Sequence, residues 1–258
     1  MPRIRSDLPA LVLDSRDYGE SDKIITFFCQ EIGRLTVIAK GAHRSKKRFI
    51  NKLELFSFLQ ISYSKSASTG MAVLDEAELL QSFIALRQDY PRYIAASLIR
   101  EYMLLVTGET LNDDNLFQLA LWALHSLNEG EPHRQVVALF LVKLFDFLGY
   151  RPDFSTCQSC GTAPANGDRV LFSIESGGII CSACSRGLDT NGRAMTSGTM
   201  QMIHAVQQQP IARLSRFKPT GTLLAQMLDY AHRYSRFLFQ RDIHSWQSFN
   251  AQSPARLP

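Results

Sequence analysis

The sequence predicts an α+β protein of several domains: an N-terminal OB-fold β-barrel, then a helical domain with an inserted four-cysteine, zinc-finger-like module. Three observations lead to this fold class. Segments of alternating polarity fill the first eighty residues, helical periodicity takes over after Phe83, and four of the five cysteines lie within residues 157–184. The expected domains are residues 1–82 for the barrel, 83–152 and 190–249 for the helical domain, 153–189 for the module, and 250–258 for a frayed tail.

Five short strands are expected in the barrel. Residues 33–40, GRLTVIAK, alternate between apolar and polar side chains, and residues 58–64, FLQISYS, repeat the pattern. Three other segments favour strands through their β-branched, aromatic or alternating residues: 10–16, 23–30 and 71–79. Five strands are the number in a small barrel of the OB type. Cys29 lies on the apolar face of its strand, so we expect a small core residue there.

Helical periodicity defines the remaining elements. Residues 114–127 place apolar side chains at intervals of three and four, and an earlier helix is expected to begin near Pro91. Residues 134–150 are apolar on nearly all sides, which is typical of a helix buried in a bundle, and Gly149 is expected to end it. A last amphipathic helix is expected at residues 222–240.

The four clustered cysteines form two C-x-x-C pairs with twenty residues between them. This spacing is typical of a tetrahedral metal site, and four thiolates leave no coordination position open for catalysis. A redox or vestigial role is the alternative, and iron fits the same ligands as zinc. Residues 170–180 read as a hairpin that brings the second pair back to the first. The sequence thus predicts one structural zinc ion, held by Cys157, Cys160, Cys181 and Cys184.

A strongly basic segment follows the third expected strand. Between Gly33 and Leu53 the chain carries seven cations and no acid, and these are our candidate DNA contacts: Arg34, Lys40, Arg44, Lys46, Lys47, Arg48 and Lys52. Flexible cations beside a small barrel suit a phosphate backbone, although a solvated surface loop is the alternative. Thr36 and Ser62 are weaker candidates on the same face. Phe49 and Tyr63 could stack on bases, but core packing is the favoured role for both.

The last part of the chain is also basic. Residues 185–258 carry a net charge of +6, against +2 for residues 1–80 and −4 for residues 81–184. This excess could supply a second DNA surface, and ordinary surface solvation explains it equally well. The cations concerned are Arg213, Arg216, Lys218, Arg233, Arg236 and Arg241.

Several classes of protein are disfavoured. The sequence contains no phosphate-binding P-loop, dinucleotide fingerprint, nucleophile elbow or H-E-x-x-H motif, so we expect no enzyme. The longest apolar run, at residues 136–142, is far shorter than the roughly 20 residues of a membrane span. The N-terminal residues do not resemble a signal peptide. We therefore expect a cytoplasmic protein with no membrane partner.

Four segments of the sequence match the pattern of one known family. The longest is GESDKIITFFCQEIGRLTVIAKGAHRSKKRF at residues 19–49. The others are LGYRPDFSTCQSCG, GGIICSAC and RDIHSWQSF, at residues 148–161, 177–184 and 241–249. Together they resemble the bacterial recombination mediator family RecO: the first is similar to that family's barrel signature, and all four occur in the family's order and span most of the chain.

The resemblance implies a DNA repair and recombination mediator. Such a protein binds single- and double-stranded DNA, anneals complementary strands, and helps load RecA onto strands coated by single-strand-binding protein. RecR and the acidic C-terminal tail of single-strand-binding protein are the implied partners, RecA is an indirect one, and the nucleoid is the implied place of action during repair. No motif identifies residues of a pocket for that tail. The alternative is a zinc-stapled protein–protein adaptor with no DNA binding of its own.

Overall fold

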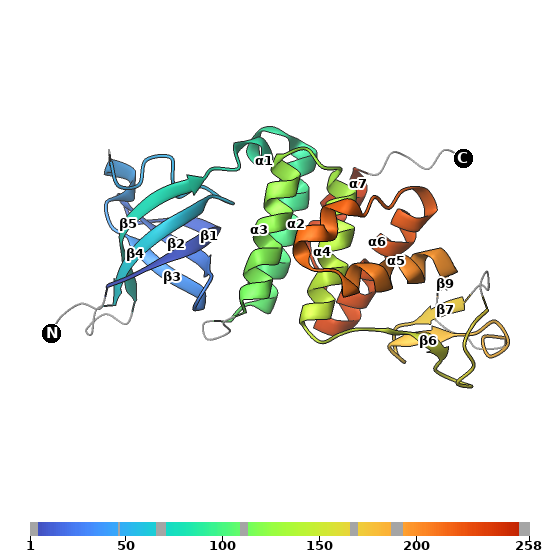
Figure 1. The fold of residues 1–258 in the computed structure, drawn as a ribbon. Helices are drawn as coiled ribbons and strands as arrows, with labels where there is room; N and C mark the ends of the chain where they lie inside the picture. The colour runs from blue at the N-terminus through green and yellow to red at the C-terminus, as the bar shows by residue number, and fades with distance from the viewer. Residues whose placement is uncertain are drawn as a thin grey trace. The chain divides into compact units, whose positions relative to one another are not determined.

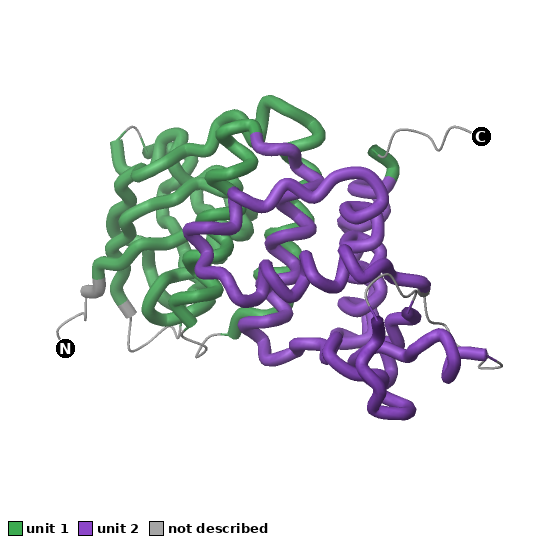
Figure 2. The backbone as a smooth tube through the Cα atoms, turned by 45° about the vertical axis from the view of Figure 1, so that its right-hand side comes forward, with its two compact units in different colours: residues 1–130, 251–258 green, residues 131–250 purple. Residues whose placement is uncertain are grey.

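The computed structural model describes residues 5–45, 47–65, 71–108, 113–165, 170–186 and 193–252. The chain forms two compact units, one of residues 1–130 with 251–258 and one of residues 131–250 (Figure 2). The domain boundaries expected from the sequence stay a prediction. Within the described ranges, no helix combines the length and the apolarity that crossing a membrane requires.

The N-terminal unit begins with a closed five-stranded barrel, as predicted (Figure 1). Its strands are β1 (Arg5–Tyr18), β2 (Asp22–Cys29), β3 (Gly33–Ala39), β4 (Phe58–Lys65) and β5 (Ala72–Gln81). They follow the order β1-β2-β3-β5-β4 around the barrel. The β3–β5 pairing is parallel and closes the barrel, while the other pairs are antiparallel.

The barrel core follows the predicted alternation. Leu35, Val37 and Ala39 are buried along β3, and Cys29 is fully buried among apolar neighbours, which confirms the expected core role. Burial raises the pKa of the Cys29 thiol, so this cysteine stays protonated. Ser62 lies on the outer face, as the alternation predicts, but neighbouring groups cover it and leave it only 5% exposed. Its hydroxyl donates to Asp7 on the neighbouring strand.

Three helices complete the N-terminal unit: α1 (Ile84–Gln88), α2 (Tyr90–Val106) and α3 (Asp114–Asn128). The Asp89 carboxylate caps α2 by accepting from the Arg92 N–H at 2.9 Å, and Asp113 caps α3 in the same way. Phe117 of α3 lies 5.4 Å from the Phe28 ring of the barrel, measured between centroids. The α3 helix therefore packs on the barrel through aromatic contacts.

The second unit is built on α4 (His133–Phe147), α5 (Ser197–Gln208), α6 (Gly221–Phe239) and α7 (Ser245–Ala251). Every side chain from Gln135 to Phe145 is buried, so α4 is the central helix that its all-round apolarity predicted. Gly149 adopts a φ of 81°, a left-handed conformation that ends the helix. Of these helices, α5 and α7 were not expected from the sequence.

The cysteine module forms a four-stranded sheet in the same unit. Its strands are β6 (Asp153–Cys157), β7 (Val170–Ser173), β8 (Gly178–Ile180) and β9 (Arg193–Met195), in the order β6-β8-β7-β9. The antiparallel β7–β8 pair is the predicted hairpin. The Phe172 ring of β7 lies 5.0 Å from Tyr230 and 5.7 Å from Tyr234, both on α6, so an aromatic cluster attaches the sheet to the helices.

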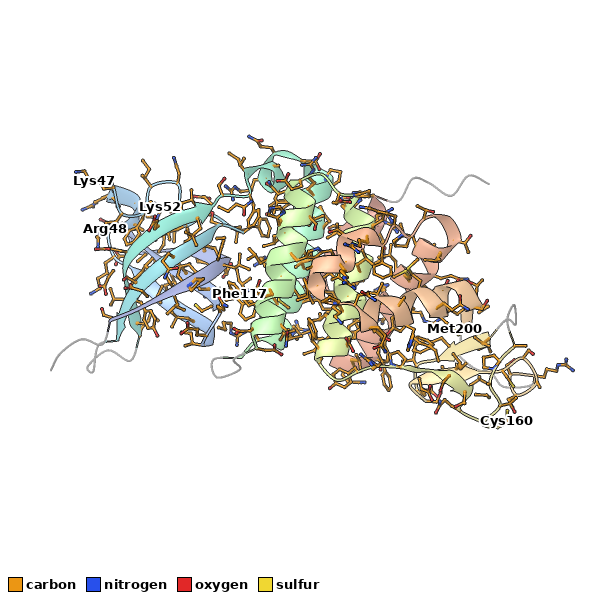
Figure 3. All side chains as sticks on the ribbon, viewed as in Figure 1. Lys47, Arg48, Lys52, Phe117, Cys160 and Met200 are labelled. Atoms are coloured by element: carbon orange, nitrogen blue, oxygen red, sulfur yellow. The ribbon has the colours of Figure 1, made fainter. Side chains whose placement is uncertain are left out.

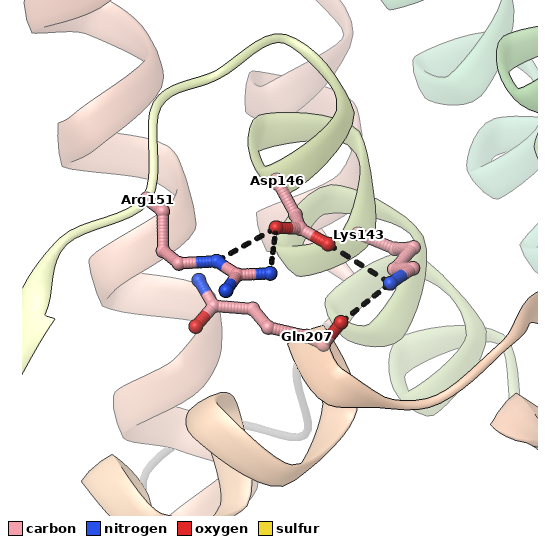
Figure 4. A network of polar contacts seen from close by, with 4 residues as sticks. All are labelled: Lys143, Asp146, Arg151 and Gln207. Atoms are coloured by element: carbon pink, nitrogen blue, oxygen red, sulfur yellow. Dashed lines mark hydrogen bonds and ion pairs between the residues drawn. The ribbon is translucent and has the colours of Figure 1, made fainter.

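A buried ionic network fixes the start of the module (Figure 4). The Lys143 ammonium donates to Asp146 Oδ2 at 2.9 Å and to the Gln207 carbonyl oxygen at 2.6 Å. The other Asp146 oxygen accepts two hydrogen bonds from Arg151, at 2.8 and 2.5 Å. Because Arg151 lies two residues before β6, the network ties the entry of the module to α4 and to the end of α5.

Candidate nucleic-acid interface and metal centre

The cationic segment between β3 and β4, residues 40–57, is called the basic loop below. It is anchored by two buried side chains, Phe49 and Leu53, each 3% exposed. The Ser45 hydroxyl accepts the backbone N–H groups of Arg48 and Phe49, both at 3.1 Å. This turn and the two anchors hold the loop against the barrel and leave Lys47 and Arg48 exposed.

Two cations of the basic loop, Arg48 and Lys52, contact β5. Lys52 Nζ donates to the Ala77 carbonyl oxygen at 2.7 Å. The Arg48 guanidinium donates to the Lys40 carbonyl oxygen at 3.3 Å and lies 4.8 Å from the centre of the Phe49 ring. Figure 3 shows Lys47, Arg48 and Lys52 at the same end of the barrel. Contacts with carbonyl oxygens do not remove the positive charges of Arg48 and Lys52, so both side chains can still attract phosphates.

A groove of about 540 Å³ runs beneath the basic loop. Lys47, Arg48 and Lys52 of the basic loop line it. The other residues that line it come from β1, β4 and β5: Asp7, Gln60, Ile61, Ser62, Glu76, Ala77 and Glu78. Sequence reasoning missed the acidic ones, because only the pairing of the strands brings them beside the loop.

The other candidate DNA contacts lie in different settings. Lys40 and Arg44 are exposed at the start of the basic loop, and Lys46 lies outside the described residues. Arg34 is half-buried and donates to the Leu104 carbonyl oxygen at 2.8 Å, near the end of α2. This bond gives Arg34 a structural task between barrel and helix. The structure does not bring it to the groove.

The weaker candidates fit core or structural roles. Phe49 and Tyr63 are buried, 3% and 7% exposed, so the favoured core packing describes both. The Thr36 hydroxyl lies 3.4 Å from that of Thr26 on the neighbouring strand. Ser62 lines the groove, but its hydroxyl is directed to Asp7. Each of these four side chains therefore makes its contact within the barrel.

Three of the six basic C-terminal candidates have acidic partners within the second unit, whereas Arg213, Arg216 and Arg241 are exposed. Lys218 pairs with Glu131, and Arg236 lies 2.8 Å from Asp242. Arg233 lies 4.0 Å from Asp229. These pairs favour ordinary surface solvation over a second DNA surface.

Four cysteine side chains converge in the module, as predicted. The Sγ atoms of Cys157, Cys160, Cys181 and Cys184 all lie within 4.8 Å of one another. Those of Cys160 and Cys181 are 3.9 Å apart. A tetrahedral ion with Zn–S bonds of about 2.3 Å has S···S edges of about 3.8 Å, so the sulfurs fit a single ion.

Backbone turns aim the thiols at this point. The Gly161 N–H donates to the Cys157 carbonyl oxygen at 2.8 Å, and Gly161 adopts a φ of 73° that closes the first turn. The Ser185 N–H donates to the Cys181 carbonyl oxygen at 3.0 Å, which closes the second. The parallel β6–β8 pairing then places the two turns side by side.

The local electrostatics favour a thiolate at the most buried ligand. The Cys181 N–H donates to Cys157 Sγ at 3.3 Å, and chiefly this bond lowers the pKa of the Cys157 thiol to about 6. A hydrogen bond from Thr162 is the main cause that lowers the pKa of Cys160. Since metal ligands must be deprotonated, these contacts prepare the site for a cation.

The second unit contains another hollow, which the sequence did not predict. Its volume is about 580 Å³, and it is lined by the start of the module and by α5, including Arg151, Phe154, Met200 and His204. Met200 is labelled in Figure 3. The unexpected α5 helix explains why sequence reasoning found no candidate residues here.

These features define a class of protein: an OB-like barrel followed by a helical region that carries a four-cysteine, metal-type site. Comparison with known proteins is more specific. Residues 3–83 match the model of "Recombination protein O N terminal", and residues 87–247 match that of "Recombination protein O C terminal". The chain belongs to the RecO family.

Relatives named DNA repair protein RecO match most of the chain. The protein of Desulfitobacterium hafniense is 28% identical over 243 residues, which cover 93% of this chain and 88% of the relative. That of Halalkalibacterium halodurans is 28% identical over 87% of this chain and 86% of its own. That of Syntrophobacter fumaroxidans is 32% identical over 67% of this chain and 68% of its own.

Proposed function

We propose that the protein is a non-enzymatic mediator of DNA repair and homologous recombination that binds DNA through the basic loop. It binds single and double strands without sequence specificity, anneals complementary strands, and helps to load RecA onto strands coated by single-strand-binding protein. Membership of a family of DNA repair proteins supports the general role. The observation that carries the DNA contact is the group of cations that lines the groove: Lys47, Arg48 and Lys52.

The chemistry of this contact is charge neutralisation. Two strands repel each other through their phosphates, and a protein that neutralises part of both lowers the cost of bringing them together. The exposed Lys40 and Arg44 extend the cationic surface of the basic loop. Phosphates are alike at every nucleotide, so a contact of this kind carries no sequence information.

The cysteine cluster acts in this proposal as a structural staple. Cys157, Cys160, Cys181 and Cys184 would hold one zinc ion and complete its coordination, so the ion supplies folding energy and no catalysis. Iron fits the same four thiolates, and metal analysis of the purified protein distinguishes the two.

The proposed partners follow from the family resemblance. They are RecR, the acidic tail of single-strand-binding protein and, indirectly, RecA. The proposed location is the cytoplasm, with association to the nucleoid during repair. The competing function is a protein–protein adaptor that does not itself bind DNA.

Annealing and competition assays test the proposal. The protein should accelerate the pairing of complementary oligonucleotides, and single strands of equal length but unrelated sequence should compete for it almost equally. An adaptor without DNA binding gives no acceleration and no competition. A preference above about a thousandfold, the low end for sequence-specific proteins, contradicts the non-specific mode.

A further inference from the structure

The groove is lined by acidic as well as basic side chains. Asp7 of β1 is paired with Ser62 of β4, and Ser62 is paired with Glu76 of β5. Along the same strands, Gln60 is paired with Glu78. Glu76 and Glu78 are two residues apart, so both side chains project from the outer face of the barrel, into the groove.

The carboxylates lie beside the cations that we assign to DNA. Lys52 Nζ is bonded to the carbonyl oxygen of Ala77, the residue between Glu76 and Glu78. The Arg48 guanidinium reaches the carbonyl oxygen of Asp75 at 3.5 Å. Both glutamates are exposed, so their charges face the solvent volume that a bound strand would enter.

We infer that Glu76 and Glu78 weaken DNA binding at the basic loop and thereby speed the release of the strand. A phosphate that approaches Lys47, Arg48 or Lys52 also approaches these two carboxylates, and like charges repel over a Debye length of about 8 to 10 Å. Asp7 adds to the same field, although its carboxylate is also the acceptor for Ser62. This inference rests on the proposed function, because it requires the basic loop to be the DNA contact.

The composition of β5 supports the inference. Glutamate is depleted in β-strands, where β-branched and aromatic residues pack better on a pleated surface. Two glutamates at adjacent outward positions of one strand also repel each other. A DNA contact that must be passed on needs a limited affinity, and two acidic side chains beside the cations supply such a limit.

The test compares Glu76→Gln/Glu78→Gln with the unchanged protein in binding to a fluorescent single-stranded oligonucleotide. Glutamine keeps the size and polarity of the side chain and removes the charge. At low salt, the double variant should bind about three- to tenfold more tightly, with slower dissociation as well as faster association. The difference should shrink at about 1 M salt, where the Debye length falls to about 3 Å.

Glu31→Gln is the matched control: it removes an exposed charge from the same barrel, outside the residues that line the groove, and should change affinity much less.

Two further variants separate this inference from the proposed function. Lys47→Gln/Arg48→Gln should weaken binding if the basic loop contacts DNA. If it does so while the glutamine variant at positions 76 and 78 binds no more tightly than the unchanged protein, the inference is wrong and the DNA contact stands. If neither double variant alters affinity, the DNA contact at the basic loop is wrong as well. Glu78→Gln alone provides the test if the double variant misfolds. This single variant should change the logarithm of the affinity by about half as much as the double variant does.

Discussion

At the scale of the residue, the contacts of a cationic side chain determine the role of that residue more than its charge does. Arg34 and Lys52 belong to one segment of the sequence that carries seven cations and no acid. In the structure, Arg34 bonds to the end of α2, whereas Lys52 lines the groove. The sequence predicts that such cations exist, but which of them reaches a common surface depends on strand pairing and on the anchoring of the loop by Phe49 and Leu53.

The cysteines were more predictable than the cations. The spacing within each C-x-x-C pair restricts both thiols to one turn, so the ligands could be identified without knowledge of the fold. The cations have no such local constraint. Their partners, such as Ala77 and Leu104, are more than twenty residues away along the chain.

Replacement of a single ligand tests the metal centre at this scale. Cys181→Ser should lower the bound metal, measured by elemental analysis, and should expose residues 153–186 to limited proteolysis. Three thiolates hold the ion less well than four, and the small sheet has little core of its own. Cys29→Ala is the matched control, because it removes a buried thiol from the barrel and should leave the metal content unchanged. Full metal content and protease resistance in Cys181→Ser would show that the cluster is not a metal-dependent staple.

At the scale of the element, hydrophobic periodicity predicted the long helices and the barrel strands. The α4 helix is the clearest example, since all-round apolarity led to a central position and every side chain from Gln135 to Phe145 is buried. The α5 helix was missed: its buried residues Met200, Ile203 and Val206 recur every three residues, but the polar sequence around them makes the pattern weak. The helix also contacts a distant element: the Gln226 side chain on α6 accepts from Thr199 Oγ1 at 2.6 Å.

The buried ionic network gives a prediction at the same scale. Asp146→Asn should lower the free energy of unfolding by about 2 to 4 kcal/mol, because it leaves the buried Lys143 ammonium without its charge partner. Equilibrium unfolding in urea measures the change. The control is Arg151→Gln, which removes the more exposed partner of the same aspartate and should cost about 1 kcal/mol or less. Equal losses from the two variants would contradict the importance assigned to the buried pair.

At the scale of the whole molecule, the two proposed functional sites lie in different compact units. The first carries the barrel and the basic loop, and the second carries the helical core and the cysteine module. The uneven distribution of charge along the sequence already indicated two basic segments. It did not show that Lys218, Arg233 and Arg236 have acidic partners nearby, because those partners are set by tertiary structure. Three cations of the basic loop, Lys47, Arg48 and Lys52, line one groove, and this makes the loop the better candidate for binding DNA.

The salt dependence of binding to single-stranded DNA tests most directly whether the basic loop contacts the phosphates. The logarithm of the association constant should fall linearly with the logarithm of the salt concentration, with a slope of about −0.7 for each phosphate neutralised. Lys47→Gln/Arg48→Gln should reduce the steepness of that slope by about 1.4, the value for two phosphates, without lowering the melting temperature. The control Lys218→Gln/Arg236→Gln removes the same charge from the second unit and should leave the slope unchanged. An unchanged slope in the basic-loop variant, or a reduced slope only in the control, would contradict the assignment of the DNA contact to the basic loop.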